Sequence, residues 1–181
     1  MQKNSTSNIK VLTYSAICVA LSVALNQVPL FSMPWGGSVT PMSMFIITLV
    51  GYLFGVKAGV AAGVTMGLIN LSLGGFVMHP AQVLLDYPLA FGALGLGGLF
   101  RNHKFGLHIS FIVGALGRFF FHFLAGWLFF YIWAPEGWNY ALYSAAYNIA
   151  YIGTEMIITL IVISLPPVIR AIGAIKSLSI A

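Results

Sequence analysis

The fold of this chain is indicated most clearly by residues 80–131, PAQVLLDYPLAFGALGLGGLFRNHKFGLHISFIVGALGRFFFHFLAGWLFFY. It consists of two long apolar segments, 80–100 and 106–131, separated by a short basic loop. A transmembrane α-helix needs about 20 predominantly apolar residues, so each segment is long enough to cross a bilayer. The pattern therefore predicts two neighbouring membrane-spanning helices that run in opposite directions.

The composition of the whole chain extends this prediction. Of its 181 residues, 60% are hydrophobic and only 6% are charged, whereas a soluble domain carries about 25% charged residues. A soluble fold with this composition would expose large apolar patches and aggregate. We therefore expect residues 1–181 to form one all-α, polytopic membrane domain with six transmembrane helices. These helices are predicted near residues 10–28, 40–55, 57–74, 80–100, 106–131 and 142–170.

The positions of the cations predict the orientation of these helices. All but one of the eight Lys and Arg residues precede the first helix, lie in the second or fourth connection, or follow the last span: Lys3, Lys10, Lys57, Arg101, Lys104, Arg170 and Lys176. Because cytoplasmic loops carry an excess of Lys and Arg, both termini are predicted to be cytoplasmic. Arg118 is the exception, since it falls within the fifth predicted helix.

Several classes of function have no support in the sequence. It contains no basic cluster of the kind that nucleic acid requires, and no G-x-x-x-x-G-K-[ST] phosphate-binding loop. It has neither the Cys and His spacing of a metal site nor a G-x-S-x-G or Ser-His-Asp pattern. We expect no enzymatic activity, no cofactor, no metal and no nucleic-acid partner.

Four polar residues interrupt the apolar helices at one depth. With a rise of 1.5 Å per residue, Asp86 lies about 22 Å and Arg118 about 21 Å from the cytoplasmic ends of their helices. His122 follows Arg118 by one turn, and Asn148 lies near the outer start of the last predicted span, at a comparable level. A charge within hydrocarbon costs a few kcal/mol and is usually functional, so these residues predict a site in the outer half of the membrane.

Aromatic residues gather on the same outer side. Some of them belong to the belt of Trp and Tyr at the membrane surface, but a carboxylate among aromatic faces also suits an organic cation or a flat heteroaromatic ring. The first outer loop, with Trp35 beside two glycines, is predicted to be a lid. The other aromatic residues on this side are Phe76, Tyr87, Trp127, Phe130, Trp133, Trp138, Tyr140, Tyr143 and Tyr147. Of these, Tyr87, Phe130, Tyr143 and Tyr147 are the remaining ligand-binding candidates.

Two stripes of small residues predict close helix packing. Ala16, Ala20 and Ala24 on the first helix would let another helix approach, either within the bundle or from a partner protein. Gly59, Gly63 and Gly67 on the third helix form a similar stripe, which we expect to pack inside the bundle.

Two other functions remain open on these residues. A stand-alone, proton-coupled transporter of a small organic cation would use Asp86 and His122 as proton carriers. A purely structural membrane subunit would use a buried Asp86–Arg118 pair to orient two helices.

Five short segments carry a resemblance to a known family: PWGGSV (34–39), HPAQVLLDY (79–87), RFFFHFLAG (118–126), WAPEG (133–137) and LYSAAYN (142–148). Together with the alanine stripe, they make the sequence resemble the thiamine-specific substrate-binding (S) component of energy-coupling factor (ECF) transporters. The resemblance implies a six-helix bundle in a prokaryotic cell membrane that captures thiamine from outside with high affinity. It also implies docking of Ala16, Ala20 and Ala24 on an ECF T component, which works with two ATPase subunits.

The resemblance also implies roles for individual residues. Asp86, where the family commonly has the longer Glu, and Asn148 would bind the aminopyrimidine ring. His122, Tyr143 and Trp35 would enclose the rings, with Phe130 at a position where a Trp often stacks, and Arg118 would serve the hydroxyethyl end. The expected ligand-binding residues are Asp86, Tyr87, Arg118, His122, Gly126, Phe130, Tyr143, Tyr147, Asn148 and Trp35.

Overall fold

The computed structural model describes the backbone of residues 2–180 and, apart from residues 2–7, 35 and 180, their side chains. The side chains of Lys3 and Trp35 therefore lie outside the described part. The α-helices are α1 (Gln2–Asn26), α2 (Ser43–Phe54), α3 (Val56–Ser72), α4 (Pro80–Leu84), α5 (Ala90–Ala93), α6 (Gly106–Phe129), α7 (Tyr140–Asn148), α8 (Thr154–Ile163) and α9 (Pro166–Ile180). A short hairpin joins α1 to α2, with β1 (Phe31–Ser32) and β2 (Ser38–Val39).

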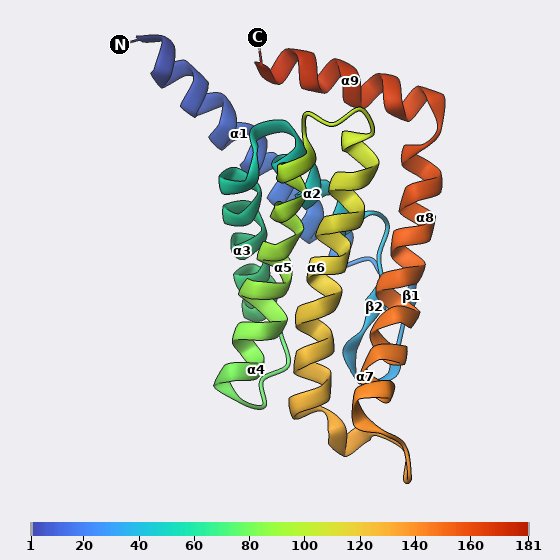
Figure 1. The fold of residues 1–181 in the computed structure, drawn as a ribbon. Helices are drawn as coiled ribbons and strands as arrows, with labels where there is room; N and C mark the ends of the chain where they lie inside the picture. The colour runs from blue at the N-terminus through green and yellow to red at the C-terminus, as the bar shows by residue number, and fades with distance from the viewer. Residues whose placement is uncertain (1, 181) are drawn as a thin grey trace.

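Several of these elements run on into one another as longer rods. A π-helical turn, η2 (Leu85–Leu89), and a 3₁₀ segment, η3 (Leu94–Phe100), join α4 and α5 into the rod Pro80–Phe100. A second π-helical turn, η5 (Ile149–Gly153), joins α7 and α8 into the rod Tyr140–Ile163. These rods, α1, α2, α3 and α6 form an elongated bundle (Figure 1).

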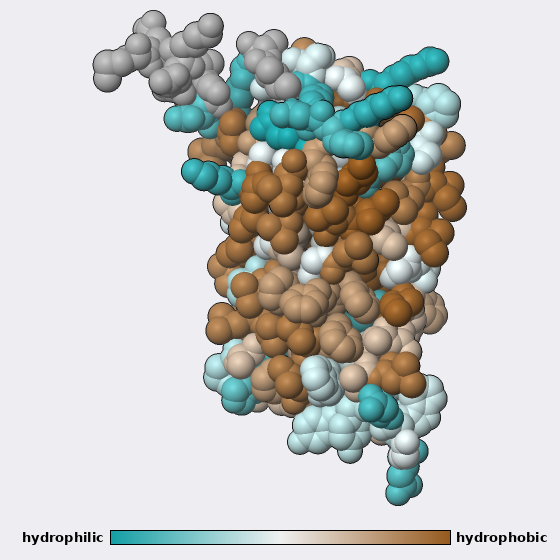
Figure 2. Space-filling view, viewed as in Figure 1, coloured by the Kyte–Doolittle hydropathy of each residue, from teal (hydrophilic) through white to brown (hydrophobic). Residues whose placement is uncertain are grey.

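The prediction of an all-α membrane fold is confirmed. Within the described residues, four segments are long and apolar enough to span a bilayer: Asn8–Asn26, Pro80–Phe100, Gly106–Phe129 and Tyr140–Ile163. Helices α2 and α3 are apolar but shorter, so the total of six spans stays a prediction. Figure 2 shows a broad brown band around the bundle and hydrophilic residues at the end that carries both termini.

The last predicted helix, 142–170, is too long. The rod ends at Ile163, and a new helix, α9, begins at Pro166. Proline lacks the N–H that would continue the helix and is favoured in a first turn, so the pair Pro166–Pro167 ends one helix and starts another. Helix α9 lies across the end of the bundle (Figure 1), where Lys176 Nζ donates a hydrogen bond to the carbonyl of Arg101 at 2.8 Å.

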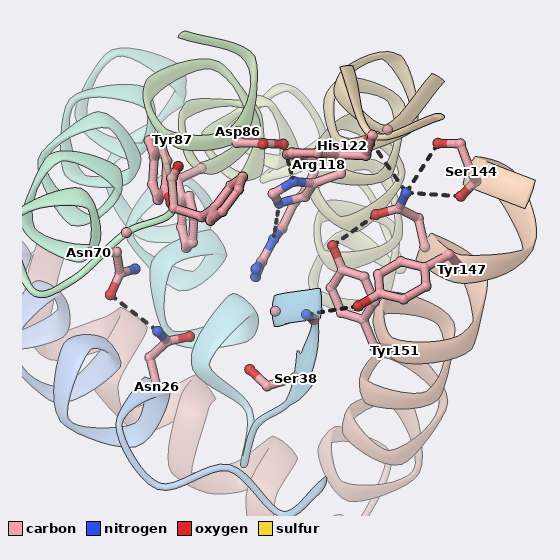
Figure 3. A pocket seen from close by; sticks show the side chains of 18 of the residues that line it. Asn26, Ser38, Asn70, Asp86, Tyr87, Arg118, His122, Ser144, Tyr147 and Tyr151 are labelled. Carbon is pink, nitrogen blue, oxygen red and sulfur yellow. Dashed lines mark hydrogen bonds and ion pairs between the residues drawn. The ribbon is translucent and has the colours of Figure 1, made fainter. Parts of the chain in front are cut away.

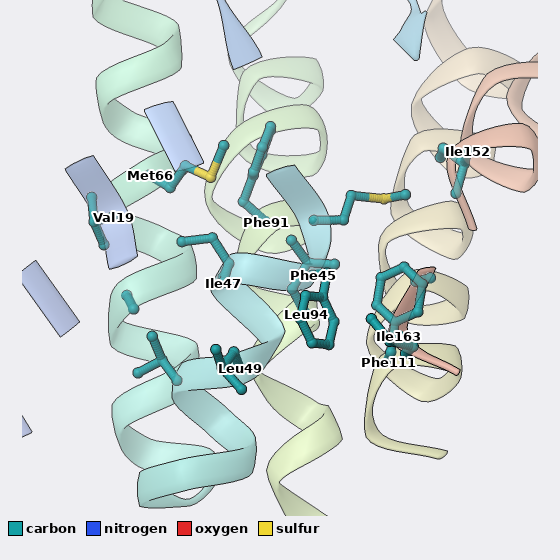
Figure 4. Packing of buried hydrophobic residues seen from close by; sticks show 14 of the residues in the cluster. Val19, Phe45, Ile47, Leu49, Met66, Phe91, Leu94, Phe111, Ile152 and Ile163 are labelled. Carbon is teal, nitrogen blue, oxygen red and sulfur yellow. The ribbon is translucent and has the colours of Figure 1, made fainter. Parts of the chain in front are cut away.

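Close packing of α3 against the rod Pro80–Phe100 depends on glycine. A Cβ atom on Gly63 would lie 2.1 Å from the carbonyl oxygen of Phe91, and one on Gly67 would lie 2.4 Å from that of Tyr87. The prediction that this stripe packs inside the bundle is therefore confirmed. Below the site, large apolar side chains such as Phe111 and Leu94 fill the core (Figure 4).

Candidate ligand-binding site

A cavity of about 380 Å³ lies in the half of the bundle away from both termini. Its volume falls in the range of small-molecule sites, about 300–1,000 Å³. Nine of the ten residues expected to bind a ligand line it: Asp86, Tyr87, Arg118, His122, Gly126, Phe130, Tyr143, Tyr147 and Asn148. The tenth, Trp35, belongs to the 3₁₀ turn η1 (Pro34–Gly36) at the tip of the hairpin.

Asp86 lies on the π-helical turn η2, which also contains Pro88. Proline interrupts the regular i→i−4 ladder, and π turns of this kind recur at functional sites. Asp86 is 8% exposed. Gln82 Nε2 donates to its Oδ2 at 2.7 Å, and Gln82 also binds the backbone of Phe76 and Met78. The carboxylate is therefore held by its own helix and aimed across the bundle.

His122 connects Asp86 to Arg118. Arg118 Nε donates to His122 Nε2 at 3.2 Å, and His122 Nδ1 lies 2.9 Å from Asp86 Oδ1. Because arginine can only donate, Nε2 must accept, and Nδ1 then carries the proton that goes to the carboxylate. The result is a chain of hydrogen bonds, Arg118 to His122 to Asp86, at the cavity wall (Figure 3).

This chain differs from the direct Asp86–Arg118 pair that the structural alternative required. Within the described residues the recorded ion pair of Asp86 is with His122, not with Arg118. The Arg118 guanidinium instead lies 4.4 Å from the centre of the Phe91 ring, and cation–π attraction stabilises it there. The imidazole thus stands between the two charges.

Asn148 and Gly126 form the junction of α6 with α7. Asn148 Nδ2 donates to the Ser144 carbonyl at 2.9 Å, and its Oδ1 accepts from the Tyr151 hydroxyl at 2.8 Å. A Cβ atom on Gly126 would lie 2.2 Å from Ser144 Oγ. Gly126 therefore allows α7 to approach α6, in addition to lining the cavity.

The β1–β2 hairpin lies against the rod Tyr140–Ile163 beside the cavity. The Tyr147 hydroxyl accepts from Gly37 N at 3.1 Å and donates to the carbonyl of Pro34. Gly37 also packs directly on the Tyr151 ring, because a Cβ atom there would lie 2.8 Å from Tyr151 Cδ1. The tip of the hairpin is thus tied to two tyrosines one turn apart.

The prediction from sequence missed several residues of this region. Trp133 was expected among the outer aromatic residues but not as a ligand-binding residue. It lines the cavity and stacks on Phe130 with ring centres 5.1 Å apart, so an indole is present although Phe130 replaces the expected Trp. Asn26 and Asn70 line the opposite wall, where Asn26 Nδ2 donates to Asn70 Oδ1 at 3.1 Å. Asn70 interrupts an apolar helix, and that signal could have revealed it.

A second buried acid, Glu155, also escaped the prediction. It is 2% exposed and lies two turns beyond Tyr147 on the same rod. The criterion that selected Asp86, a carboxylate within an apolar span, applies to Glu155 equally.

Comparison with known proteins adds independent findings. Residues 12–172 match a family described as "Thiamine transporter protein". The chain is 36% identical over 178 residues to "Thiamine transporter ThiT" of Bacillus subtilis, covering 90% of this chain and 92% of the relative. It is 30% identical over 157 residues to the protein of the same name from Lacticaseibacillus paracasei, covering 76% and 77%.

A solved structure supports the fold. ThiT from Listeria monocytogenes superposes with a TM-score of 0.74 at 24% identity, covering 88% of this chain and 96% of that one. At this identity the likeness bears on the fold alone.

Proposed function

This chain belongs to the thiamine transporter protein family, and on that premise we propose that it binds thiamine with high affinity in the cavity and delivers it into the cell. The family is one of transporters and not of enzymes. The observation that carries the proposal is the buried carboxylate of Asp86, held by Gln82 and His122 at the wall of an aromatic cavity.

Asp86 and Asn148 are proposed to bind the aminopyrimidine ring. An ionised carboxylate offers about four lone-pair sites, and two of them are used by Gln82 and His122. The others can accept N–H bonds from the exocyclic amine. The negative charge also complements the positive thiazolium ring, and charge-assisted hydrogen bonds are about twice as strong as neutral ones.

The aromatic residues are proposed to enclose both rings. Tyr143 and Tyr147 line one side of the cavity, and Phe130 with Trp133 lines another. Their faces favour a flat cation through stacking and cation–π attraction. Arg118 has donors beyond the Nε bond to His122 and would bind the hydroxyl oxygen of the hydroxyethyl group.

Transport is proposed to depend on partner proteins in a prokaryotic cell membrane. The chain contains no phosphate-binding loop, so an ECF T component and two ATPase subunits would supply the energy. The alanine stripe supports this, since Ala16, Ala20 and Ala24 are all exposed in the structure. Six spans with both termini in the cytoplasm agree with the cationic end of the bundle.

A second candidate function is stand-alone, proton-coupled transport. The direct hydrogen bond between His122 and Asp86, at 2.9 Å, favours it, because such a pair could pass a proton. Uptake of thiamine into liposomes that contain only this protein, abolished by a protonophore, would support the second candidate over the first.

The proposal is tested by titrating the purified protein in detergent with thiamine and following intrinsic tryptophan fluorescence. Trp133 lines the cavity, so a bound heteroaromatic ligand should change its emission. We expect saturable quenching at nanomolar thiamine. Absence of any response up to millimolar thiamine, in protein shown to be folded by circular dichroism, would contradict the proposal.

A further inference from the structure

Glu155 is a buried carboxylate outside the cavity lining. It lies in the first turn of α8 and is 2% exposed. Among the described residues it forms no ion pair with a cation. A buried carboxylate without a cation must be stabilised by hydrogen bonds, and its partners therefore indicate why an acid stands at this position.

Its partners all belong to the junction between the hairpin and α2. Glu155 Oε2 accepts from the backbone N–H of Thr40 at 3.0 Å and from the Thr40 hydroxyl at 2.7 Å. Its Oε1 accepts from the backbone N–H of Met44 at 3.1 Å, and the Ser43 hydroxyl lies 3.4 Å away. Hydrogen-bond donors thus approach both carboxylate oxygens. A carboxylate satisfies all of these donors because both of its oxygens accept, whereas an amide cannot, because its nitrogen donates.

Glu155 replaces the missing N-terminal cap of α2. The N-cap residue of α2, Met42, makes no side-chain capping bond and has a φ of 66°, in the left-handed region. Such a conformation is costly for a non-glycine residue and persists only where its surroundings hold it. The Glu155 charge accepts the N–H of Met44 in the first turn of α2, where a helix dipole favours an anion. A residue 111 positions away therefore holds this turn together.

The hairpin has two kinds of attachment to the rod. At its base, Val39 and Thr40 are 4% and 3% exposed, and Thr40 is bound by Glu155. At its tip, Pro34 and Gly37 are hydrogen-bonded to the Tyr147 hydroxyl, and Gly37 packs on the Tyr151 ring. The base is buried and bound by a charge, whereas the tip is near the surface, so an opening motion would release the tip first.

We propose that Glu155 is a positioning residue that fixes the base of the hairpin to α8, so that the tip closes over the cavity in one register. The charge keeps Thr40 and the start of α2 in place while the Tyr147 contacts break and re-form. The closing role rests on the proposed function, since it takes thiamine as the molecule that the hairpin covers. The anchoring itself can be measured without any ligand.

The test is hydrogen exchange of the ligand-free protein with Glu155→Gln. The amide has nearly the same shape but turns one acceptor into a donor that faces an N–H group. We expect amides in residues 37–44 to exchange at least about tenfold faster, because a charge-assisted hydrogen bond is lost, with protection of α6 unchanged. Glu155→Asp, which keeps the charge, should restore part of the protection.

Thr159→Val is the matched control. Thr159 lies one turn along the same helix, is 0% exposed, and its hydroxyl has no hydrogen-bond partner. Removing that hydroxyl changes buried polarity on α8 without touching the hairpin, so exchange in residues 37–44 should match the unaltered protein. If Glu155→Gln does not fold, Thr40→Val removes one of the same bonds from the other side and should raise exchange by a few-fold.

Stopped-flow thiamine binding separates positioning from a general loss of stability. Glu155→Gln should raise the dissociation rate about tenfold and change the association rate little, since affinity changes within one site are mostly in dissociation. Unchanged exchange in residues 37–44, or faster exchange spread through α6, would overturn the anchoring. Faster local exchange with an unaltered dissociation rate would overturn the closing role. If the unaltered protein binds no thiamine, the proposed function fails, while the exchange result still decides the anchoring.

Discussion

Replacing Asp86 with Asn is the most direct perturbation of the candidate site. The change keeps the side-chain shape but turns one carboxylate oxygen into an amide group that donates. The Asp86 oxygens now accept from Gln82 at 2.7 Å and from His122 at 2.9 Å. His122 cannot adapt by moving its proton, because its other nitrogen accepts from Arg118 at 3.2 Å. The amide nitrogen of Asn at position 86 would therefore face an N–H donor of either Gln82 or His122.

The expected loss of thiamine affinity follows from this geometry. A hydrogen bond to a charged group contributes about 1.5–3 kcal/mol, and about 1.4 kcal/mol corresponds to a factor of ten in the dissociation constant. Asp86→Asn should therefore weaken thiamine binding by about 10- to 100-fold. Removal of the favourable charge beside the thiazolium ring would add to this loss.

The assay is a thiamine titration of the purified variant by intrinsic fluorescence or by calorimetry. Glu136→Gln is the matched control, since it makes the same change of charge at an exposed acid in the loop before α7, and it should leave the dissociation constant unaltered. An Asp86→Asn protein that is folded and binds within about threefold of the original would refute the assignment of Asp86 to the ligand.

Three further outcomes are expected. Gly126→Ala should lower the stability by about 1–3 kcal/mol through overpacking, because the new Cβ would lie 2.2 Å from a serine oxygen on α7; thermal unfolding measures this, and Gly173→Ala, where no atom lies within 4 Å, should not destabilise. Tyr147→Phe removes both bonds to the hairpin tip and should speed thiamine dissociation several-fold in stopped flow; an unchanged rate would contradict the closing role of the tip. Ala20→Trp should keep thiamine binding but abolish uptake in cells with the partner proteins, while Ile17→Trp, off the stripe, should retain uptake.

Much of the fold could be predicted because the relevant signals are local or global properties of the chain. The apolar segments around 80–100 and 106–131 predict their helices directly, and both were found as Pro80–Phe100 and Gly106–Phe129. The error at residues 164–170 arose because the apolar pattern continues through the Pro166–Pro167 pair. The hairpin also escaped a detailed prediction, since its strands are only two residues long.

The membership of the candidate site could also be predicted to a large extent. Depth within a helix depends only on the number of residues and the rise per residue, so Asp86, Arg118 and His122 could be placed at one level without a structure. Trp133 could be placed only among the outer aromatic residues, and Asn26 was not predicted, because it lies near a helix end where the apolar pattern stops. Glu155 meets the same criterion as Asp86, a carboxylate within an apolar span, but its role could not be predicted, since it depends on partners more than a hundred positions away.

The membrane class, the all-α fold, the cationic end of the bundle and the depth of the polar residues all follow from the amino-acid sequence. Which of these polar residues touch one another follows only from the packing of the helices. It placed His122 between Asp86 and Arg118, and it set Glu155 at the start of α2. The spacing of residues along one helix sets their depth in the membrane. Contact between helices depends instead on the rotation and separation of those helices. Close packing at glycines and the two π-helical turns set this rotation and separation.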